Sequence, residues 1–421
     1  MQTISTSPDQ QARNRYRWVV LVLCWLAFTM TSVDRSTWGP ASVFVGEDLG
    51  VPLASLGVFA TAYYIGYVCS NALTGVLSDR FGGREVVTVS LAGAGVFMMI
   101  FGSTTSAVIG IGVQAVVGFF AGADYAAGVK LLASWFQPKE LGKVMGLFTS
   151  ATSLGTVIAN TAVPWMINHY SWHASYHLFG AISIVTAVIC YVIIRPGPVT
   201  NTIATAGDGK RPSAWKTLTT NRDLMLLSLA GFGGFWGTYG FVTWSNALLI
   251  KGHGVSGTTA GFIVAIFAGV AVVSKPLTGI LGDRIGSARK PAIVILALFS
   301  IILIFFGTLD NVPALLIAAP ILGLVGYGYL PLIVAMIPRL VSSDVTGTAA
   351  GASNAFWQIA STLVPLAIGA VFSATGSFLA AFAALAVGPM IGAVILYFVD
   401  ENGGKTTVAD TEPVTPDTIT S

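Results

Sequence analysis

Gly75–Glu85 reads GVLSDRFGGRE, and a similar stretch at Gly279–Lys290 reads GILGDRIGSARK. The aspartates of the two stretches lie 204 residues apart, and so do the glycines that open them. A second pair, Gly142-x-x-x-Gly146 and Gly347-x-x-x-Gly351, recurs at an offset of 205 residues. The chain is therefore interpreted as a tandem repeat of two similar halves.

The composition indicates a membrane protein. Of the 421 residues, 54% are hydrophobic and 9% are charged, whereas soluble domains are about 25% charged. Apolar runs recur from end to end, and a helix that crosses a bilayer needs roughly 20 such residues. Because backbone amides in lipid must be satisfied within the segment, these runs predict helices. The three cysteines lie in such runs, which favours packing over disulfides.

Twelve membrane helices are expected, in two sets of six. The polar segment 195–222, rich in Gly, Pro and Thr, is interpreted as the linker between the sets. The predicted organisation is a terminal segment 1–17, a six-helix bundle 18–194, the linker, a second six-helix bundle 223–399 and a disordered tail 400–421. The expected helices lie at 18–45, 54–77, 86–105, 107–135, 144–168, 174–194, 223–250, 257–281, 290–309, 312–338, 346–373 and 377–399.

The basic residues predict the orientation in the membrane. Of the 21 Lys and Arg residues, 17 fall in segments on one side if the N-terminus is inside. Only Lys251 is left for the outside. Basic loops stay on the cytoplasmic face, so we expect both termini to be cytoplasmic, in a multi-pass protein of the inner cell membrane.

On these residues the chain resembles the major facilitator superfamily over nearly its whole length. The resemblance implies an all-α membrane fold of two six-helix bundles related by a pseudo-twofold axis, with the substrate at mid-membrane between them. We interpret the stretches Gly75–Glu85 and Gly279–Lys290, which carry the motif of this superfamily, as charged gating latches. The alternative is a basic loop that only orients the protein. The carrier motif Gly-x-x-x-Asp-Arg-x-Gly-Arg-Arg stands here as Gly75, Asp79, Arg80, Gly82 and Arg84, with Gly83 off pattern, and in a weaker copy as Gly279, Asp283, Arg284 and Gly286.

Five ionisable residues remain inside the expected helices. Such residues are costly in lipid and by default mark substrate or proton pathways. The alternative is that they form ion pairs that only hold helices together. The five are Asp34, Arg35, Asp124, Lys130 and Lys275.

Arg35 is the first candidate for binding an anion, because a guanidinium stays charged and fits a carboxylate with two parallel hydrogen bonds. Asp34 cannot share its helix face, since neighbours point about 100° apart. One of the two is expected to face the cavity and the other a neighbouring helix. Asp34 is therefore a candidate proton site or a partner that sets the conformation of Arg35.

Lys275 is the expected second anion-binding group. It lies eight residues before Asp283 and so about 12 Å inside the membrane from that loop. Asp124, near mid-span in 107–135, is a second candidate for the coupled proton. Lys130 lies about 9 Å nearer the cytoplasm, where it either binds the anion or extends to the interface.

Three stretches resemble the anion:cation symporters within the superfamily: SVDRSTWGPA, SWFQPKELGKVMGLFTSATSLG and FVTWSNALLIKGHGVSGTTAGF. That family carries sugar acids and other organic anions with protons or sodium. The resemblance implies that Asp34 is the proton-linked acid and Arg35 the carboxylate-binding residue. The chain departs from the family at Ala121, where the family has its coupling glutamate, and at Gln114, where the superfamily usually has arginine.

Lys275-Pro276-x-x-Gly279 separately resembles the basic-Pro-x-x-Gly motif of monocarboxylate and oxalate carriers, which place a substrate-binding cation there. Ala271 stands where monocarboxylate carriers have an aspartate, and the eleventh helix lacks the lysine of oxalate carriers. Both resemblances predict an organic anion as substrate.

Amphipathic rings and amides are expected to complete the site, since they suit a hydroxylated or aromatic carboxylate. The alternative for each ring is an interfacial belt. His169, His173 and His177 recur every four residues, which allows a metal site, but their place at an outer turn favours interfacial histidines. The candidates are Trp38, Tyr63, Tyr64, Tyr125, Trp236, Tyr239, Trp244, Asn246, Asn354, Trp357 and Gln358.

The sequence therefore predicts a symporter that imports a small organic anion by alternating access, coupled to H⁺, with Na⁺ as the alternative ion. The anion is a mono- or dicarboxylate, a sugar acid or an aromatic acid, clamped between Arg35 and Lys275 of opposite halves. Asp34 and Asp124 carry the proton. An efflux antiporter for drugs or metabolites and a membrane sensor are the alternatives. We expect a monomer that is not an enzyme and has no cofactor, metal or nucleic-acid partner.

Overall fold

The computed structural model describes residues 8–195, 214–342 and 345–401, which are almost entirely helical and contain no strand. A bilayer offers the backbone no hydrogen-bond partner, so each apolar run bonds within itself as a helix. Besides a 3₁₀ turn at Leu53–Ser55, the helices are α1 (Pro8–Ser36), α2 (Trp38–Asp48), α3 (Gly57–Phe81), α4 (Gly83–Gly102), α5 (Ala107–Trp135), α6 (Pro138–His169), α7 (Trp172–Ile193), α8 (Ala214–Thr220), α9 (Arg222–His253), α10 (Gly257–Ile285), α11 (Arg289–Gly307), α12 (Val312–Leu340), α13 (Thr346–Thr375) and α14 (Phe378–Tyr397).

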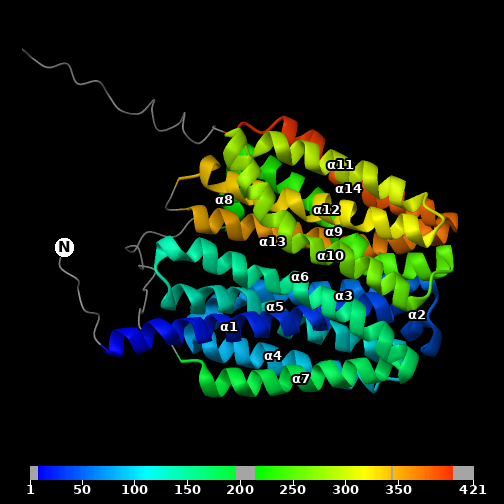
Figure 1. Cartoon of the computed structure of the whole chain (residues 1–421), viewed down its shortest axis with the longest axis horizontal. Helices are drawn as coiled ribbons and strands as arrows, with labels where there is room; N and C mark the ends of the chain where they lie inside the picture. Colours follow the sequence, from blue (N-terminus) through cyan, green and yellow to red (C-terminus); the bar gives the residue numbers. More distant parts are fainter. Residues whose placement is uncertain (1–7, 196–213, 343–344, 402–421) are drawn as a thin grey trace, which may run out of the picture.

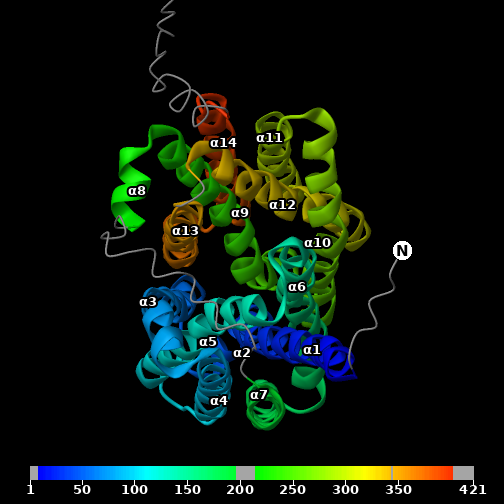
Figure 2. The ribbon, with the colours of Figure 1, turned by 90° about the vertical axis from the view of Figure 1, so that its left-hand side faces the viewer.

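The helices form two groups that lie side by side (Figure 1). Helices α1–α7, here the first half, lie in one group, and α8–α14, the second half, lie in the other. Viewed along the helices, α3 and α6 of the first half face α13 and α10 of the second (Figure 2). The pairs α3–α13 and α6–α10 are in contact. The space between the halves is thus bordered by helices from both repeats.

Eleven helices of the described residues are long and apolar enough to cross a membrane. The first of these spans, Arg15–Asp48, joins α1 and α2 across a break at Thr37 and contains the helix expected at 18–45. Helix α6 is long enough at 32 residues but is not among the eleven, because Ser, Thr, Gly and Asn recur along it. With α6, the number of membrane-spanning helices among the described residues would equal the twelve that we expected.

Part of the expected linker is ordered, since α8 lies within it. The remainder of that segment, 196–213, and the tail from 402 onward lie outside the described residues. Glu401 is described although it was expected to be disordered. It accepts hydrogen bonds from the Ser287 hydroxyl at 2.6 Å and the Ala288 amide at 2.7 Å, and it pairs with Arg339. The chain after α14 is therefore fixed to the turn before α11 and to the end of α12.

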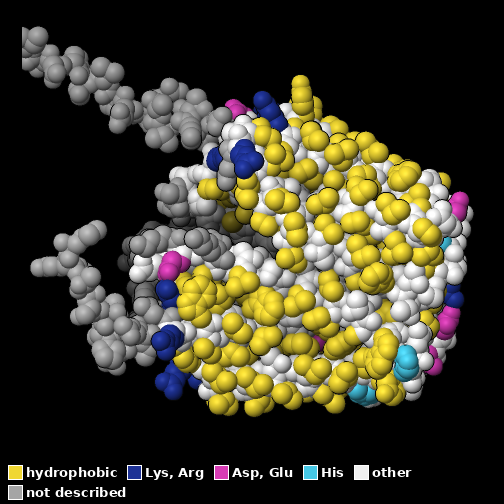
Figure 3. Space-filling view, viewed as in Figure 1, with side chains coloured by type: hydrophobic (Ala, Val, Ile, Leu, Met, Phe, Trp, Pro, Cys, Tyr) yellow, Lys and Arg dark blue, Asp and Glu magenta, His cyan; other side chains and the backbone are white. Residues whose placement is uncertain are grey.

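The two ends of the molecule differ in charge. Dark blue Lys and Arg side chains gather at the end where α1 begins, whereas His and acidic side chains lie at the other end (Figure 3). Hydrophobic side chains cover most of the face between the two ends. We call the first end the basic end, with Arg17, Arg80, Arg84, Arg195, Arg284, Arg289 and Arg339, and the other end the opposite end, with Glu47, Asp48, His173, Lys251 and His253.

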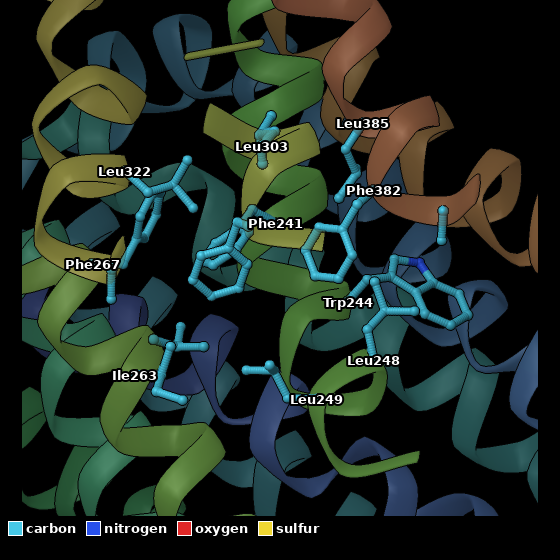
Figure 4. Packing of buried hydrophobic residues seen from close by; sticks show 14 of the residues in the cluster. Phe241, Trp244, Leu248, Leu249, Ile263, Phe267, Leu303, Leu322, Phe382 and Leu385 are labelled. Atoms are coloured by element: carbon cyan, nitrogen blue, oxygen red, sulfur yellow. The ribbon is translucent and has the colours of Figure 1, made fainter. Parts of the chain in front are cut away.

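The interior of the second half is a cluster of large apolar side chains (Figure 4). Phe241 of α9 packs against Phe267 of α10 with ring centroids 4.5 Å apart, and against Phe306 of α11 at 5.5 Å. Trp244 is buried in the same cluster, and its indole donates a hydrogen bond to the Pro365 carbonyl at 3.0 Å. This packing fixes α9, and with it the residues of α9 that reach the space between the halves.

Each copy of the motif contains a turn in which a glycine has a positive φ. Gly82, between α3 and α4, has a φ of 94°, and Gly286, between α10 and α11, has a φ of 70°. These left-handed conformations are easily adopted only by glycine, which explains why both copies keep it. Arg84 pairs with Glu85 at 2.8 Å. The latch that we expected depends on the side chains of Asp79 in α3 and Asp283 in α10, which are not among the side chains that the structure describes.

Candidate functional site

A cavity of about 140 Å³ lies between the halves, near the middle of the helices. Side chains of both halves line it, and they are aromatic, hydroxyl-bearing, amide-bearing or cationic. No Asp or Glu is among them. They are Phe28, Arg35, Tyr67, Tyr125, Thr149, Thr152, Phe235, Thr238, Tyr239, Lys275, Tyr327, Tyr329, Leu330, Asn354 and Gln358.

Arg35 lies in the last turn of α1, directly before the break at Thr37. Pro40 explains the break, because proline has no N–H to donate to the carbonyl four residues earlier. The Arg35 guanidinium carbon lies 5.6 Å from the centre of the Tyr239 ring on α9. This cation–π contact joins the two halves across the cavity.

Asp34 points away from the cavity. Its side chain is 3% exposed and accepts a hydrogen bond from the Ser183 hydroxyl of α7, with distances of 3.3 and 3.2 Å to its two oxygens. Arg35 lines the cavity instead. The two neighbouring charges therefore diverge, as the 100° step of the helix requires.

Lys275 of α10 lines the same cavity from the second half. Its ammonium lies 5.2 Å from the centre of the Tyr327 ring and donates a long hydrogen bond of 3.4 Å to the Ser153 hydroxyl of α6. Both partners are neutral. One cation from each half thus faces the cavity.

Asp124 of α5 is 1% exposed and does not line the cavity. It accepts a hydrogen bond of 2.9 Å from the Thr31 hydroxyl of α1. Thr31 precedes Asp34 by three residues, so Asp124 contacts α1 about one turn from Asp34. Ala121, three residues before Asp124, is buried in the core of the first half.

A second pocket of about 20 Å³ lies beyond Arg35, which lines both spaces. Three predicted site residues, Trp38, Tyr63 and Tyr64, line this small pocket and not the larger cavity. Trp38 stacks on Phe59 with ring centroids 4.8 Å apart. Tyr64 meets Tyr239 at 5.9 Å, so it reaches the main cavity only through that ring.

Tyr125, Tyr239, Asn354 and Gln358 line the cavity, as predicted from sequence. Gln358 is largely buried, and its side-chain oxygen has no hydrogen-bond partner among the described residues. A buried amide oxygen without a partner is costly. Gln358 therefore places an unsatisfied acceptor beside the cavity that it lines.

Five other predicted residues lie outside the cavity, among them Trp244, which is buried in the core of the second half. Lys130 donates a hydrogen bond of 2.8 Å to the Ser78 carbonyl near the end of α3. The Trp236 indole donates to the Ala384 carbonyl of α14 at 2.9 Å. The Asn246 amide donates to Asn160 at 2.8 Å, and Trp357 packs against Phe235 in the core of the second half.

Several lining residues were missed from sequence, notably Thr149, Thr152, Tyr67 and Tyr327. The repeat holds a signal for one of them, because Thr149 and the predicted Asn354 are 205 residues apart. The same relation, at 204 residues, joins Arg35 to Tyr239. Applying the offset to each candidate would have found Thr149.

The halves are joined by hydrogen bonds on the opposite-end side of the cavity. Thr61 donates to the Thr362 carbonyl at 2.8 Å, and Asn246 is bonded to Asn160. Nearer the surface, Asn168 donates to Thr258 at 2.8 Å, and Lys251 pairs with Glu47. The opposite end is therefore closed in this structure.

A family model described as Major Facilitator Superfamily matches residues 24–365 and, in a second match, 246–420. Together the matches cover nearly all of the chain and both repeats. The chain belongs to the Major Facilitator Superfamily. The expected all-α fold of two six-helix bundles and the expectation of a transporter that is not an enzyme are confirmed.

Curated members of this superfamily resemble the chain over most of its length. A probable galactarate/D-glucarate transporter of Bacillus subtilis is 26% identical over 396 residues, covering 86% of this chain and 87% of the relative. A D-galactonate transporter of Escherichia coli is 24% identical over 409 residues (90% and 94%). A probable sulfoacetate transporter of Cupriavidus necator is 23% identical over 392 residues (87% and 90%).

Among solved structures, a bacterial homologue of the human lysosomal transporter Spinster, in an inward-facing and unoccupied conformation, matches with a TM-score of 0.76. The identity is 16%, and the match covers 95% of this chain and 99% of the other. This superfamily member is thus an integral multi-pass membrane protein, and the predicted resemblance to transporters of sugar acids and other organic anions is confirmed.

Proposed function

We propose that this superfamily member imports a small organic anion across the inner cell membrane together with protons. The observation that carries the proposal is the charge of the cavity. Arg35 and Lys275 face it from opposite halves, and none of its lining residues is acidic. An anion is the ligand that such a cavity stabilises. The names of the relatives, which include transporters of galactarate, D-galactonate and sulfoacetate, support the same class.

Arg35 and Lys275 bind the anion from two sides. The guanidinium holds a carboxylate through two parallel hydrogen bonds, and the ammonium supplies a compact second charge. Since each cation belongs to a different half, a bound anion attracts both halves toward itself. Binding thereby favours closure of the cavity on the basic-end side, which completes a cycle of alternating access.

Protons are carried by the carboxylates behind Arg35. Asp34 is the neighbour of Arg35 in α1, and Thr31 in the same helix holds Asp124 at 2.9 Å. A proton on either carboxylate changes the charge around the turn of α1 that presents Arg35. Both side chains are buried and bonded to hydroxyl groups, so each carboxyl group keeps a partner in either protonation state.

The orientation follows from the basic end. Lys and Arg accumulate on the cytoplasmic side of membrane proteins, so we assign the basic end to the cytoplasm. The closed opposite end then faces the periplasm. The cavity with two cations disfavours the alternative of an exporter for cationic amphipathic drugs, because like charges repel.

Uptake into membrane vesicles tests the proposal. Vesicles containing the protein are given labelled galactarate, D-galactonate or sulfoacetate, with an imposed pH gradient, an imposed Na⁺ gradient or neither. We expect uptake above that of empty vesicles to rise with the pH gradient and to be abolished by a protonophore. Uptake driven only by the Na⁺ gradient would contradict proton coupling. Uptake of none of the acids would contradict the substrate class.

A further inference from the structure

The cavity contains two positive charges and nothing on its walls to neutralise them. Arg35 and Lys275 line it, and its other lining residues are all uncharged in their ordinary forms. The nearest recorded partners of the cations are the Tyr239 ring at 5.6 Å, the Tyr327 ring at 5.2 Å and the Ser153 hydroxyl at 3.4 Å. Rings and hydroxyl groups stabilise a cation without cancelling its charge.

The carboxylates nearest in sequence and space do not fill this role. Asp34 is turned toward Ser183 of α7, and Asp124 toward Thr31 of α1. Neither lines the cavity, and both are at most 3% exposed. No other Asp or Glu is among the described residues that line this cavity. The net charge that the cavity presents to a ligand is therefore two positive units.

Closure around a ligand makes this imbalance costly. In the present conformation water can screen the two cations, but transport requires that the cavity be sealed from both sides. A buried charge without a counter-charge costs several kcal/mol. A ligand with one negative charge leaves one cation unmatched in the sealed state, whereas a ligand with two negative charges matches both.

We propose that the preferred substrate is a dianion whose two acidic groups are held by Arg35 and Lys275, and that Lys275 is the residue that selects dianions over monoanions. The inference rests on the proposed function, because it refines the substrate of the same site. The guanidinium binds the first acidic group in either kind of ligand. The ammonium of Lys275 distinguishes them, since only a dianion has a second group for it.

The polar lining of the cavity indicates a hydroxylated chain between the acidic groups. Thr149, Thr152 and Asn354 line the cavity, and Gln358 adds a buried amide oxygen without a hydrogen-bond partner among the described residues. An amide oxygen accepts hydrogen bonds only from a donor, and a hydroxyl group on the ligand supplies one. An unsubstituted hydrocarbon chain would leave it unpaired.

Binding of matched acids to the purified full-length protein tests the inference. Each pair has the same carbon chain and differs only at one end, where a carboxylate replaces a CH₂OH group: galactarate and galactonate, xylarate and xylonate, tartrate and threonate. Dissociation constants are measured by calorimetry at one fixed salt concentration, because salt screens such interactions. In the wild type we expect at least one dianion to bind about tenfold more tightly than its monoanion.

The variants assign this preference to one side chain. Lys275→Gln is expected to reduce the dianion-to-monoanion ratio to about 1 while changing monoanion affinity by less than about threefold, since Arg35 remains. Lys275→Arg is expected to retain the preference. Lys130→Gln is the matched control, because it removes the same charge from a span but lies outside the cavity. It should leave the ratio as in the wild type.

The outcomes separate this inference from the proposed function. If dianion and monoanion bind equally in every pair, dianion selection is wrong, while transport of organic anions stands. A preference that survives Lys275→Gln overturns the role of Lys275. If no acid of any pair binds to the wild type, both the inference and the proposed function fail. Because the wild type alone decides the first and third outcomes, the test does not depend on Lys275→Gln being stable.

Discussion

The two halves of the molecule are alike where they touch and unlike where they enclose the cavity. At the opposite end, a Cβ added at Gly57 would lie 2.1 Å from the Pro365 carbonyl oxygen, and one added at Gly261 would lie 2.2 Å from that of Asn160. The glycines are 204 residues apart, and Pro365 and Asn160 are 205 apart. The same close contact between halves is therefore built twice.

At mid-membrane the repeat-related positions differ in chemistry. The 204-residue offset relates Arg35 to Tyr239, and Asp34 to Thr238. It also relates Asp124 to Gly328 and Lys275 to Asn71. Both buried carboxylates thus belong to the first half, and the two halves supply their cations from different helices. The repeat is therefore symmetric in the glycine contacts at the opposite end and asymmetric in the charged residues at mid-membrane.

The largest effect is expected from removing the charged member of the pair Arg35 and Tyr239. Arg35→Ala should lower uptake of the transported acid by about 100-fold, because it removes a desolvated cation opposite the anion. Tyr239→Phe keeps the ring under the guanidinium and should lower uptake by less than about fivefold. Initial rates in vesicles, corrected for the amount of protein, measure both. Equal losses of uptake in Arg35→Ala and Tyr239→Phe would contradict the larger role that we assign to the charge of Arg35.

The symmetric contact is tested by Gly57→Val and Gly261→Val. Each side chain would collide with a carbonyl of the other half, and overpacking of this kind forces the backbone apart. We expect each variant to lose transport by about 30-fold while binding the acid with an affinity within about threefold of the wild type. Gly112→Val is the control, since a Cβ there meets no atom within 4 Å. A clear difference in transport between Gly57→Val and Gly261→Val would contradict the proposal that the two contacts are equivalent.

The asymmetric carboxylates are tested by Asp34→Asn and Asp124→Asn. An amide still accepts the hydrogen bond from Ser183 or Thr31 but cannot release a proton. We expect stimulation of uptake by a pH gradient to fall by about tenfold in at least one of the two variants, while exchange of internal for external acid at equal pH persists. Thr238→Ala, at the position related to Asp34, should leave the pH dependence unchanged. Full pH stimulation in both carboxylate variants would contradict the assignment of the proton.

The smallest effect is expected at the basic end. Each half has its own carboxylate–arginine pair there, and the pair of the second half is the more buried. Burial raises the pKa of Glu401, but the hydrogen bonds from Ser287 and the backbone of Ala288 and Arg289, with the charge of Arg339, outweigh burial and lower the pKa. A lowered pKa in the folded protein means that Glu401 stabilises the fold above its ordinary pKa of 4.5, and that this contribution is lost as the pH falls. Glu401→Gln should reduce stability by about 1–2 kcal/mol near pH 7.

Thermal unfolding in detergent at several pH values measures this contribution. The difference between wild type and Glu401→Gln should shrink as the pH falls below 4.5. Glu140→Gln in the first half is the comparison, because its pair with Arg17 at 2.9 Å is more exposed, with 34% of the Glu140 side chain accessible. It should cost less than about 1 kcal/mol. A larger loss at Glu140 than at Glu401 would contradict the predicted ranking of the two halves.

The fold could be predicted from sequence because each apolar run has one stable form in a bilayer, and because Asp79 and Asp283 mark the repeat. What the sequence did not predict is the break at Thr37 and the short helix α8. A single proline three residues past Thr37 gives only a weak signal. Helix α8 is seven residues long, too short for a periodic pattern to identify.

The site was predicted in part. Arg35 and Lys275 could be found because charge in an apolar span is rare, and such rarity points to function. For Lys130, Trp236 and Trp357 the sequence does not show whether the side chain lines the cavity. Their helices are apolar on all sides, so the pattern does not indicate which face meets the cavity. Trp357, for example, packs where Gly231 leaves room for its indole, a fit that depends on the rotation of two helices.

The polar character of α6 bears on how the chain is made. Helix α6 contacts α1 of its own half and α10 of the other, and its Thr149 and Thr152 face the cavity. During synthesis α6 ends at His169, well before α10 begins at Gly257. Helices α1, α2, α5 and α7 of its own half cover part of α6, but the side that packs on α10 still lacks that protein surface. The first repeat alone therefore leaves the α10-facing side of α6 uncovered until translation reaches the second repeat.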